Sequence, residues 1–164
     1  MNQPLDVLKA HWKHDAFRPT QEEIINTVLA GKDTFALLPT GGGKSICFQI
    51  PALLKPGICL VISPLVALMK DQVENLKQKN IKAIALTGGI SFEETNNLLD
   101  NCAFGGYKFL YVSPERLQQD WVLERIKNLN VNLVAIDEAH CISQWGHDFR
   151  PAYLKISELK EYFH

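Results

Sequence analysis

The sequence predicts an α/β domain with a mostly parallel central sheet and helices on both faces. Short, continuously apolar segments alternate with longer segments whose apolar residues recur at helical spacing. Uninterrupted apolar strands are typical of a sheet that is covered on both faces. Because a crossover helix between successive strands makes those strands parallel, the alternation itself predicts the sheet. The expected strands are residues 35–38, 58–62, 83–86, 109–112 and 133–136.

Length and composition are those of a globular domain. The chain has 164 residues, which is the length of one domain, and 46% of them are apolar. The formal net charge of −1 gives no overall basic field, so a nucleic acid would have to bind a local patch. Cys47, Cys59, Cys102 and Cys141 form no C-x-x-C pair, and we find no secretory or membrane-spanning segment. We expect reduced thiols in a cytoplasmic protein that has no membrane partner.

The expected helices have recognisable start and stop signals. A short opening helix is expected within residues 1–15, where Leu5, Leu8 and Trp12 lie at helical spacing. Thr20 and Glu23 predict a capping box for the next helix, which would end at Gly31, and a further helix would run from about residue 44 to 54.

The later helices each follow a strand. Ser63-Pro64 predicts an N-cap with proline in the first helical position, before an apolar stripe. Ser91 and Glu94 predict a second capping box, and Ser113-Pro114 predicts another helix start. The residues of the expected stripe are Leu65, Leu68, Met69, Val73 and Leu76.

A glycine-rich loop, P-T-G-G-G-K-S, follows the first expected strand. Successive glycines let backbone N–H groups surround an anion, Lys44 adds a positive charge, and the Ser45 hydroxyl can ligate a metal ion. The helix that follows directs its positive dipole end to the same place. The loop therefore predicts a nucleoside triphosphate site with Mg²⁺, although Leu38 replaces the first glycine of the generic motif and a plain turn is the alternative. The expected phosphate-binding residues are Thr40, Gly41, Gly42, Gly43, Lys44 and Ser45.

Two carboxylates, Asp137 and Glu138, directly follow the last expected strand. In parallel α/β sheets ligands bind at the carboxyl ends of the strands, where the glycine-rich loop also lies. Asp137 could hold a phosphate-bound Mg²⁺ opposite Ser45, while Glu138 could orient a water molecule or accept its proton. These two carboxylates and Lys44 are thus the candidate catalytic residues. The alternative is that the acidic pair caps a helix.

A zinc site is not expected. His140, Cys141 and His147 lie close together in sequence, but a structural zinc site requires four ligands at motif spacing. His140 is instead interpreted as a polar residue that couples the nucleotide site to its neighbour.

Five motifs, in their order along the chain, resemble those of the first motor domain of RecQ-type DNA helicases. The resemblance covers about residues 16–156, and its most discriminating part is the loop C-I-S-Q-W-G-H-D-F-R-P. It implies a RecA-like P-loop NTPase fold and an ATP-driven motor that moves 3′ to 5′ on single-stranded DNA or on DNA with a 3′ tail, in repair and recombination. The compartment would be the nucleoid of a bacterium or the nucleus of a eukaryote. The motifs are residues 17–21 (FRPTQ), 39–45, 63–65 with 69–72, 113–117 (SPERL) and 137–151.

The same resemblance assigns an adenine site. It places Arg18 and Gln21 against the base, with the Gln21 amide reading the base edge and favouring ATP over GTP. His14 occupies the position at which the family often has an aromatic residue stacked on the base. The alternative for Gln21 is an exposed residue in the first turn of a helix.

Two further motifs would face the DNA backbone. By resemblance, Ser63, Lys70 and Gln72 contact phosphates, as do Ser113 and Arg116. The alternatives are helix capping by the serines and solvated positions for the charged side chains.

The loop after the acidic pair combines aromatic residues with an arginine, which suits stacking on unpaired bases. In the RecQ family this loop links DNA binding to ATP hydrolysis. The alternative is that its aromatic residues fill the core. The residues expected to bind DNA or to couple it to the ATP site are His140, Gln144, Trp145, His147, Phe149 and Arg150.

We expect residues 1–164 to be the first motor domain, with a helical N-terminal extension at about 1–15 and without the second motor domain. Because helicases of this type complete the ATP site with an arginine from the second domain, the chain alone is expected to bind Mg-ATP weakly and not to unwind DNA. Two rival functions remain open. One is another P-loop enzyme, such as a small-molecule kinase; the other is a nucleotide-gated single-strand-binding module without activity of its own.

Overall fold

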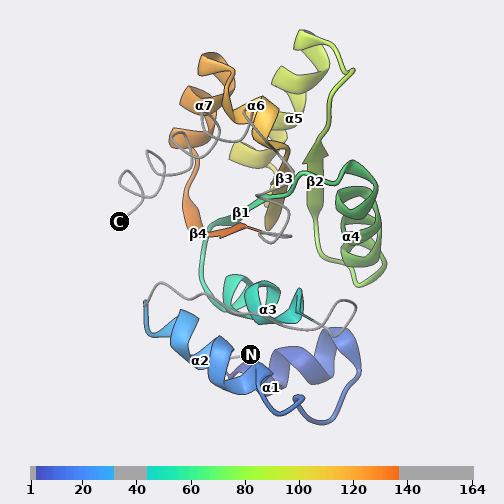
Figure 1. The fold of residues 1–164 in the computed structure, drawn as a ribbon, viewed down its shortest axis with the longest axis vertical. Helices are drawn as coiled ribbons and strands as arrows, with labels where there is room; N and C mark the ends of the chain where they lie inside the picture. Colours follow the sequence, from blue (N-terminus) through green and yellow to red (C-terminus); the bar gives the residue numbers. More distant parts are fainter. Residues whose placement is uncertain (1–2, 32–43, 137–164) are drawn as a thin grey trace. The chain divides into compact units, whose positions relative to one another are not determined.

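The computed structural model describes residues 3–31 and 44–136, which form parts of two compact units, Met1–Pro56 and Gly57–His164 (Figure 1). We describe each unit by itself. The expected strand at 35–38 and the loop at 39–43 lie outside the described residues, as does everything after Ile136.

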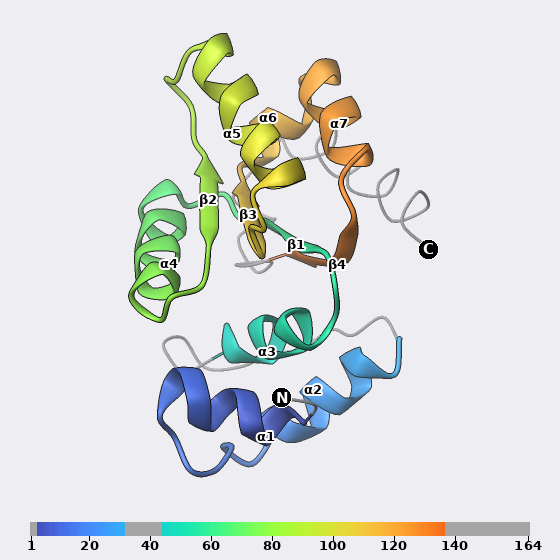
Figure 2. The same cartoon turned by 180° about the vertical axis from the view of Figure 1, so that it is seen from behind.

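The described residues of the first unit, 3–31 and 44–56, form helices and the turns that join them. Helix α1 (Pro4–Val7) continues into a π-helical turn (Leu8–Trp12), which confirms the short opening helix. Helices α2 (Gln21–Leu29) and α3 (Ile46–Leu54) follow, and α1 and α2 both pack against α3, on its same side (Figures 1 and 2). The opening helix buries Val7 and Leu8 rather than Leu5. The buried residues of this unit are Val7, Leu8, Ile25, Ile46 and Ile50.

The start of α2 differs from the expectation. Thr20 occupies the N-cap position but has helical dihedral angles (φ −97°, ψ −12°), and its side chain makes no capping hydrogen bond. The Arg18 N–H donates instead to Oε1 of Gln21 at 2.9 Å. The predicted capping box at Thr20 and Glu23 is therefore wrong, because the Gln21 amide organises the turn. The expected stop is confirmed, since Gly31 has a φ of +82°, which a residue with a Cβ rarely adopts.

The second unit contains a parallel sheet with strand order β2-β3-β1-β4. The strands are β1 (Ile58–Ile62), β2 (Ala83–Leu86), β3 (Phe109–Val112) and β4 (Val131–Ile136). Each lies where an uninterrupted apolar segment predicts it, and β4 begins two residues before the expected Leu133. All residues of β1 and β3 are buried, as expected for strands covered on both faces.

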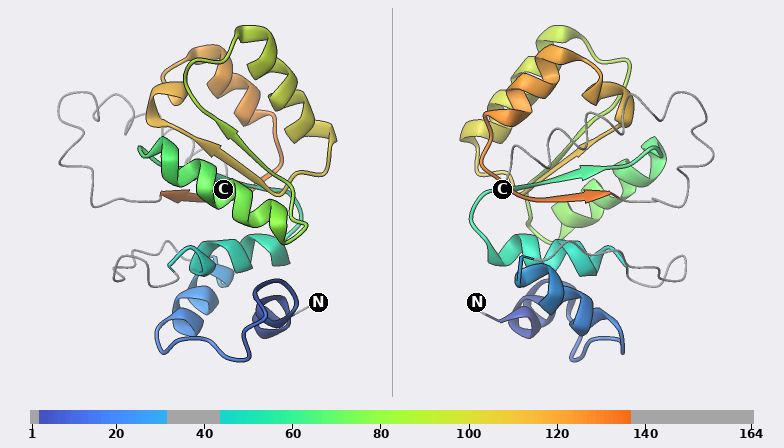
Figure 3. Two further views of the ribbon diagram at one scale, coloured as in Figure 1. Left: turned by 90° about the vertical axis from the view of Figure 1, so that its right-hand side faces the viewer. Right: turned by 60° about the vertical axis from the view of Figure 1, so that its left-hand side comes forward.

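Helices cover both faces of this sheet, as predicted. Helix α4 (Val66–Gln78) lies on one face, and α5 (Phe92–Phe104) and α7 (Asp120–Lys127) lie on the other (Figure 3). The short helix α6 (Pro114–Leu117) starts with Pro114 directly after Ser113, as expected. The start of helix α7 was not predicted from the sequence.

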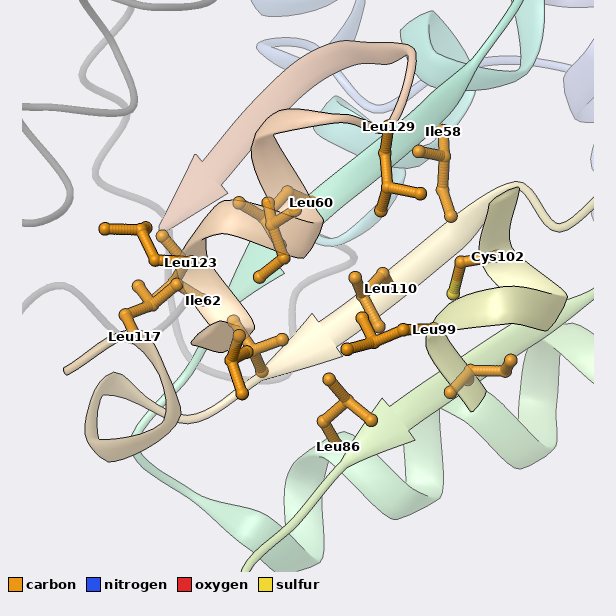
Figure 4. Packing of buried hydrophobic residues seen from close by; sticks show 14 residues of the cluster. Ile58, Leu60, Ile62, Leu86, Leu99, Cys102, Leu110, Leu117, Leu123 and Leu129 are labelled. Carbon is orange, nitrogen blue, oxygen red and sulfur yellow. The ribbon is translucent and has the colours of Figure 1, made fainter. Parts of the chain in front are cut away.

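The main core lies between the sheet and the helices α5, α6 and α7 (Figure 4). Alternate residues of β1 point into it, namely Ile58, Leu60 and Ile62, because successive side chains of a strand point to opposite faces. Leu99 of α5 and Leu117 of α6 complete the packing and are fully buried. This core fixes the strands that end at the candidate site.

The predicted starts of helices α5 and α4 have different outcomes in the structure. Ser91 caps α5 as predicted, since its Oγ accepts the Glu94 N–H at 3.0 Å. At the start of α4 the prediction is wrong: the helix begins at Val66, and the Ser63 Oγ accepts the Leu65 N–H at 3.3 Å in a turn before it. Leu65 is consequently exposed and does not belong to the buried stripe.

Candidate nucleotide and nucleic-acid site

Three polar residues lie together at the carboxyl edge of the sheet. Leu86, Val112 and Ile62 are aligned in register on neighbouring strands, so the residues that follow them end the strands side by side. These residues are Thr87, Ser113 and Ser63. In parallel α/β sheets this is the edge at which ligands bind. Ile136, the last residue of β4, aligns with Ile62 as well.

Ser63 is integrated into this edge. It is only 1% exposed, its N–H donates to the Val112 carbonyl at 3.1 Å, and its hydroxyl serves the turn before α4. The predicted N-cap role is thus replaced by a turn role.

Gln72 points into the interior and not to solvent. It is 8% exposed, and its Oε1 accepts a 2.6 Å hydrogen bond from the hydroxyl of Tyr111, a fully buried residue of β3. Lys70, two residues earlier on α4, is exposed. Of the residues of α4 expected to contact DNA, the lysine is therefore the accessible one.

Arg116 is also buried, at 8% exposure. Its Nη2 and Nε donate to the Thr87 carbonyl at 2.7 and 3.3 Å, and its Nη1 donates to Oε1 of Gln119 at 3.0 Å. Ser113, at the N-cap of α6, is buried as well and accepts the Arg116 N–H through its carbonyl at 3.1 Å. The guanidinium therefore faces the end of β2.

The first unit holds the residues expected around the base and the phosphates. Gln21 is buried at 4% exposure, so the alternative of an exposed helix residue is wrong, whereas His14 and Arg18 are exposed. Lys44 and Ser45 are half-buried at the start of α3. The Ser45 side chain makes no capping hydrogen bond, unlike Ser91. The Ser45 hydroxyl is a suitable ligand for Mg²⁺, because Mg²⁺ prefers oxygen ligands.

The remaining predicted site residues lie outside the described residues, as does Cys141, which was not predicted as a site residue, and the metal and base roles depend on Ser45, Asp137 and Glu138. Within residues 3–31 and 44–136 no three His, Cys, Asp or Glu side chains gather as a metal site. The same residues contain no helix long and apolar enough to cross a membrane. The residues outside are Thr40, Gly41, Gly42, Gly43, Asp137, Glu138, His140, Cys141, Gln144, Trp145, His147, Phe149 and Arg150.

The described cysteines are free and buried, in keeping with the expected thiols. Burial raises the pKa of Cys47 to about 11 and that of Cys102 to about 12, with the positive charge of Arg125 acting in the opposite direction on Cys102. Burial holds the pKa of Cys59 far above the usual range for a thiol. The three thiols are therefore protonated and poorly nucleophilic at neutral pH.

Three residues of this region were not predicted from the sequence, namely Thr87, Tyr111 and Gln119. Thr87 had a usable signal, because it directly follows an apolar strand in the same way as Ser63 and Ser113. Tyr111 lies inside a strand and carried no signal beyond its apolar neighbours. Gln119 lies between two helices, of which the second was not predicted.

A parallel sheet with a polar carboxyl edge and a Lys-Ser pair at a helix start are typical of α/β nucleotide-binding domains. The chain belongs to the DEAD/DEAH box helicase family, whose family model matches residues 18–163. Within this family it resembles the motor domain of RecQ helicases.

Relatives with curated descriptions support that resemblance. The chain is 49% identical to the probable ATP-dependent DNA helicase RecS of Bacillus subtilis, over 89% of this chain and 29% of the relative. It is 48% identical to the ATP-dependent DNA helicase RecQ of Pasteurella multocida, over 97% of this chain and 25% of the relative. The chain thus spans less than a third of the length of these two relatives.

Solved structures show the same fold at low identity. The helicase MrfA, solved with DNA and AMPPNP, aligns with 87% of this chain and 21% of its own, at a TM-score of 0.70 and 20% identity. A hypothetical ATP-dependent RNA helicase from Sulfolobus tokodaii aligns with 96% of this chain and 48% of its own, at a TM-score of 0.71 and 20% identity. These similarities confirm the RecA-like α/β fold.

Proposed function

We propose that this chain is the ATP-binding motor domain of a RecQ-type DNA helicase that moves 3′ to 5′ on single-stranded DNA. The observation that carries the proposal is the carboxyl edge on which Thr87, Ser113 and Ser63 end three aligned strands. In a chain of the helicase family, a nucleotide and a nucleic acid can both bind at this edge of the β-sheet. The names of the relatives, ATP-dependent DNA helicases, support the same substrate.

The nucleotide is ATP. The Arg18 N–H holds the Gln21 amide at 2.9 Å in a fixed geometry, and the resemblance to RecQ helicases places the base edge against this amide. Lys44 supplies positive charge to the phosphates at the start of α3, where the helix dipole also favours an anion.

Mg²⁺ would neutralise charge on the phosphates and be held by Ser45 and Asp137. Ser45 occupies the N-cap position of α3, but its side chain makes no capping hydrogen bond, which supports a role as a metal ligand. Glu138 would orient the attacking water or accept its proton.

DNA would bind along the edge through Lys70 and the loop 140–150. Lys70 is exposed, and phosphates are contacted by such charges without regard to sequence. The aromatic residues of the loop would stack on unpaired bases, which tolerates any sequence. Gln72 supports this surface from beneath through Tyr111 and does not itself touch the strand.

A second RecA-like domain of the same protein would supply the arginine that completes the ATP site. Stabilisation of the transition state by such an arginine is the general solution in nucleotide hydrolases. The protein would act where chromosomal DNA is, in a nucleoid or a nucleus.

Unwinding polarity tests the proposal. The full-length gene product, with Mg-ATP, is given duplexes with a 3′ tail, a 5′ tail or blunt ends, each with a fluorophore and a quencher. We expect strand separation of the 3′-tailed duplex alone. Equal unwinding of the 5′-tailed duplex, or phosphoryl transfer to an added small-molecule acceptor, would contradict the proposal.

A further inference from the structure

Arg116 lies in a motif expected to touch DNA, yet its surroundings are those of a structural clamp. The side chain is buried at 8% exposure, and both of its described acceptors are neutral groups, the Thr87 carbonyl and the Gln119 amide. A guanidinium that served a phosphate would present its N–H groups to the phosphate. Here three of its N–H bonds are directed at the protein itself.

The clamp joins three parts of the chain that the sequence separates. Thr87 ends β2, Arg116 lies on α6 after β3, and Gln119 is the N-cap of α7. Arg116 donates two hydrogen bonds, from Nη2 and Nε, to the same carbonyl oxygen of Thr87, which lies 29 residues earlier in the sequence. The two N–H groups form a fork on this oxygen. Lysine, a point charge on a flexible stem, has no such fork.

The position of the clamp explains its consequence. Residue Leu86 aligns with Val112, so Thr87 and Ser113 are neighbours at the carboxyl edge. Beyond Thr87 the chain turns through Gly88 and Gly89, and among the described residues no atom outside the adjoining chain lies within 4 Å of where a Cβ would stand at either glycine. Arg116, from a later helix, holds the Thr87 carbonyl with two hydrogen bonds.

We propose that Arg116 is a positioning residue that fixes the ends of β2 and β3 against each other, and that it does not contact the DNA phosphates. The inference rests on the proposed function, because the edge that it fixes is the proposed strand-binding edge. DNA affinity then depends on the geometry of the guanidinium and not on its charge.

Two variants separate geometry from charge. Arg116→Lys keeps the positive charge and removes the fork, and Lys70→Ala removes an exposed charge that the proposed function places on a phosphate. The readout is single-stranded DNA affinity of the full-length protein over a series of salt concentrations. Each lost phosphate contact lowers the salt slope by about 0.7 for a single strand.

The clamp predicts a specific pattern. Arg116→Lys weakens DNA binding by about tenfold, because the strand-binding edge loses the geometry that the fork holds, while the salt slope and the KM for ATP without DNA stay unchanged. Lys70→Ala lowers the slope by about 0.7. If Arg116→Lys binds DNA like the parent, or if Arg116→Ala lowers the slope as Lys70→Ala does, the proposal is overturned.

A measurement without DNA keeps the two proposals apart. In the free protein, the Arg116 Nε–H should give a slowly exchanging NMR signal, and the Thr87 carbonyl carbon should shift in Arg116→Lys but not in Lys70→Ala. Rapid exchange and an unshifted Thr87 would overturn the clamp whatever the protein does to DNA. An intact clamp in a protein that fails to bind DNA would instead contradict the proposed function.

Discussion

The hydroxyl of Tyr111 donates a 2.6 Å hydrogen bond to Oε1 of Gln72, which joins strand β3 to helix α4 inside the second unit. Tyr111 is fully buried, and Gln72 is 8% exposed. The residue after Val112, at the end of the same strand, is Ser113, so this bond supports the carboxyl edge from the α4 face. Arg116 supports the same edge from α6.

Tyr111→Phe should lower the free energy of unfolding by about 1–2 kcal/mol, because it removes the donor from a buried amide oxygen. The measurement is urea denaturation followed by circular dichroism. Tyr107→Phe is the matched control, since Tyr107 is half-buried and contacts Lys82 through its ring; it should change stability by less than about 0.5 kcal/mol. Equal losses for the two variants would contradict the role of the Tyr111 hydroxyl.

Ser45→Ala should change nucleotide binding and not stability, whereas Ser91→Ala should change stability and not nucleotide binding. Ser91 caps α5, so its loss should cost about 1 kcal/mol of stability and leave nucleotide binding intact. Ser45 makes no side-chain cap, so its loss should leave stability unchanged and weaken Mg²⁺-dependent nucleotide binding. Thermal unfolding and titration with a fluorescent ATP analogue, with and without Mg²⁺, provide the two readouts. A destabilised Ser45→Ala with normal Mg²⁺ dependence would reverse the assignment.

Lys44→Ala should abolish measurable nucleotide binding, because it removes the positive charge from the phosphate loop. Lys77→Ala is the control, as this lysine is exposed on the last turn of α4. Both variants should keep the circular dichroism spectrum and the unfolding midpoint of the parent protein. Retained binding in Lys44→Ala would rule out the phosphate role of the loop.

The described thiols should resist alkylation in the native protein. In a Cys141→Ser background, we expect iodoacetamide at pH 8 to label Cys47, Cys59 and Cys102 only after unfolding, by mass spectrometry. Burial raises the pKa of Cys47 to about 11, whereas an unfolded thiol titrates near 9. The folded state therefore holds this proton more tightly, and the stability that it contributes is present below pH 9 and is lost as the pH rises from about 9 to 11. Fast native labelling would contradict the burial.

Strands were easier to predict than helix starts. All four described strands lie where the sequence has an uninterrupted apolar segment. Burial on both faces accounts for this signal in β1 and β3, whereas β4 is only half-buried. The S/T-x-x-E pattern occurs at both Thr20 and Ser91, but only Ser91 has the extended conformation that capping needs, with φ −68° and ψ 164°. At Thr20 the turn is set by Arg18 and Gln21, and no short pattern encodes that competition.

The sequence indicated which residues lie near the candidate site, but not the direction in which their side chains point. Gln21, Ser63 and Ser113 lie near strand ends or helix starts, where the sequence places them, and the structure buries all three. Their roles toward a ligand stay predictions. Their hydrogen-bond partners could not be predicted, because they depend on tertiary packing. Arg116 is the clearest case: its main acceptor is a backbone carbonyl 29 residues away. A charge in a motif predicts a ligand, whereas the fold can direct that charge inward.

The most direct test is steady-state ATP hydrolysis by the full-length gene product, with and without single-stranded DNA, in Mg²⁺ buffer. Trp145→Ala and Lys44→Ala are measured beside it. We predict a low basal rate that single-stranded DNA raises by more than about tenfold, a loss of this stimulation but not of ATP affinity in Trp145→Ala, and no hydrolysis in Lys44→Ala. A rate that does not respond to DNA, or a Trp145→Ala variant stimulated like the parent, would contradict the account.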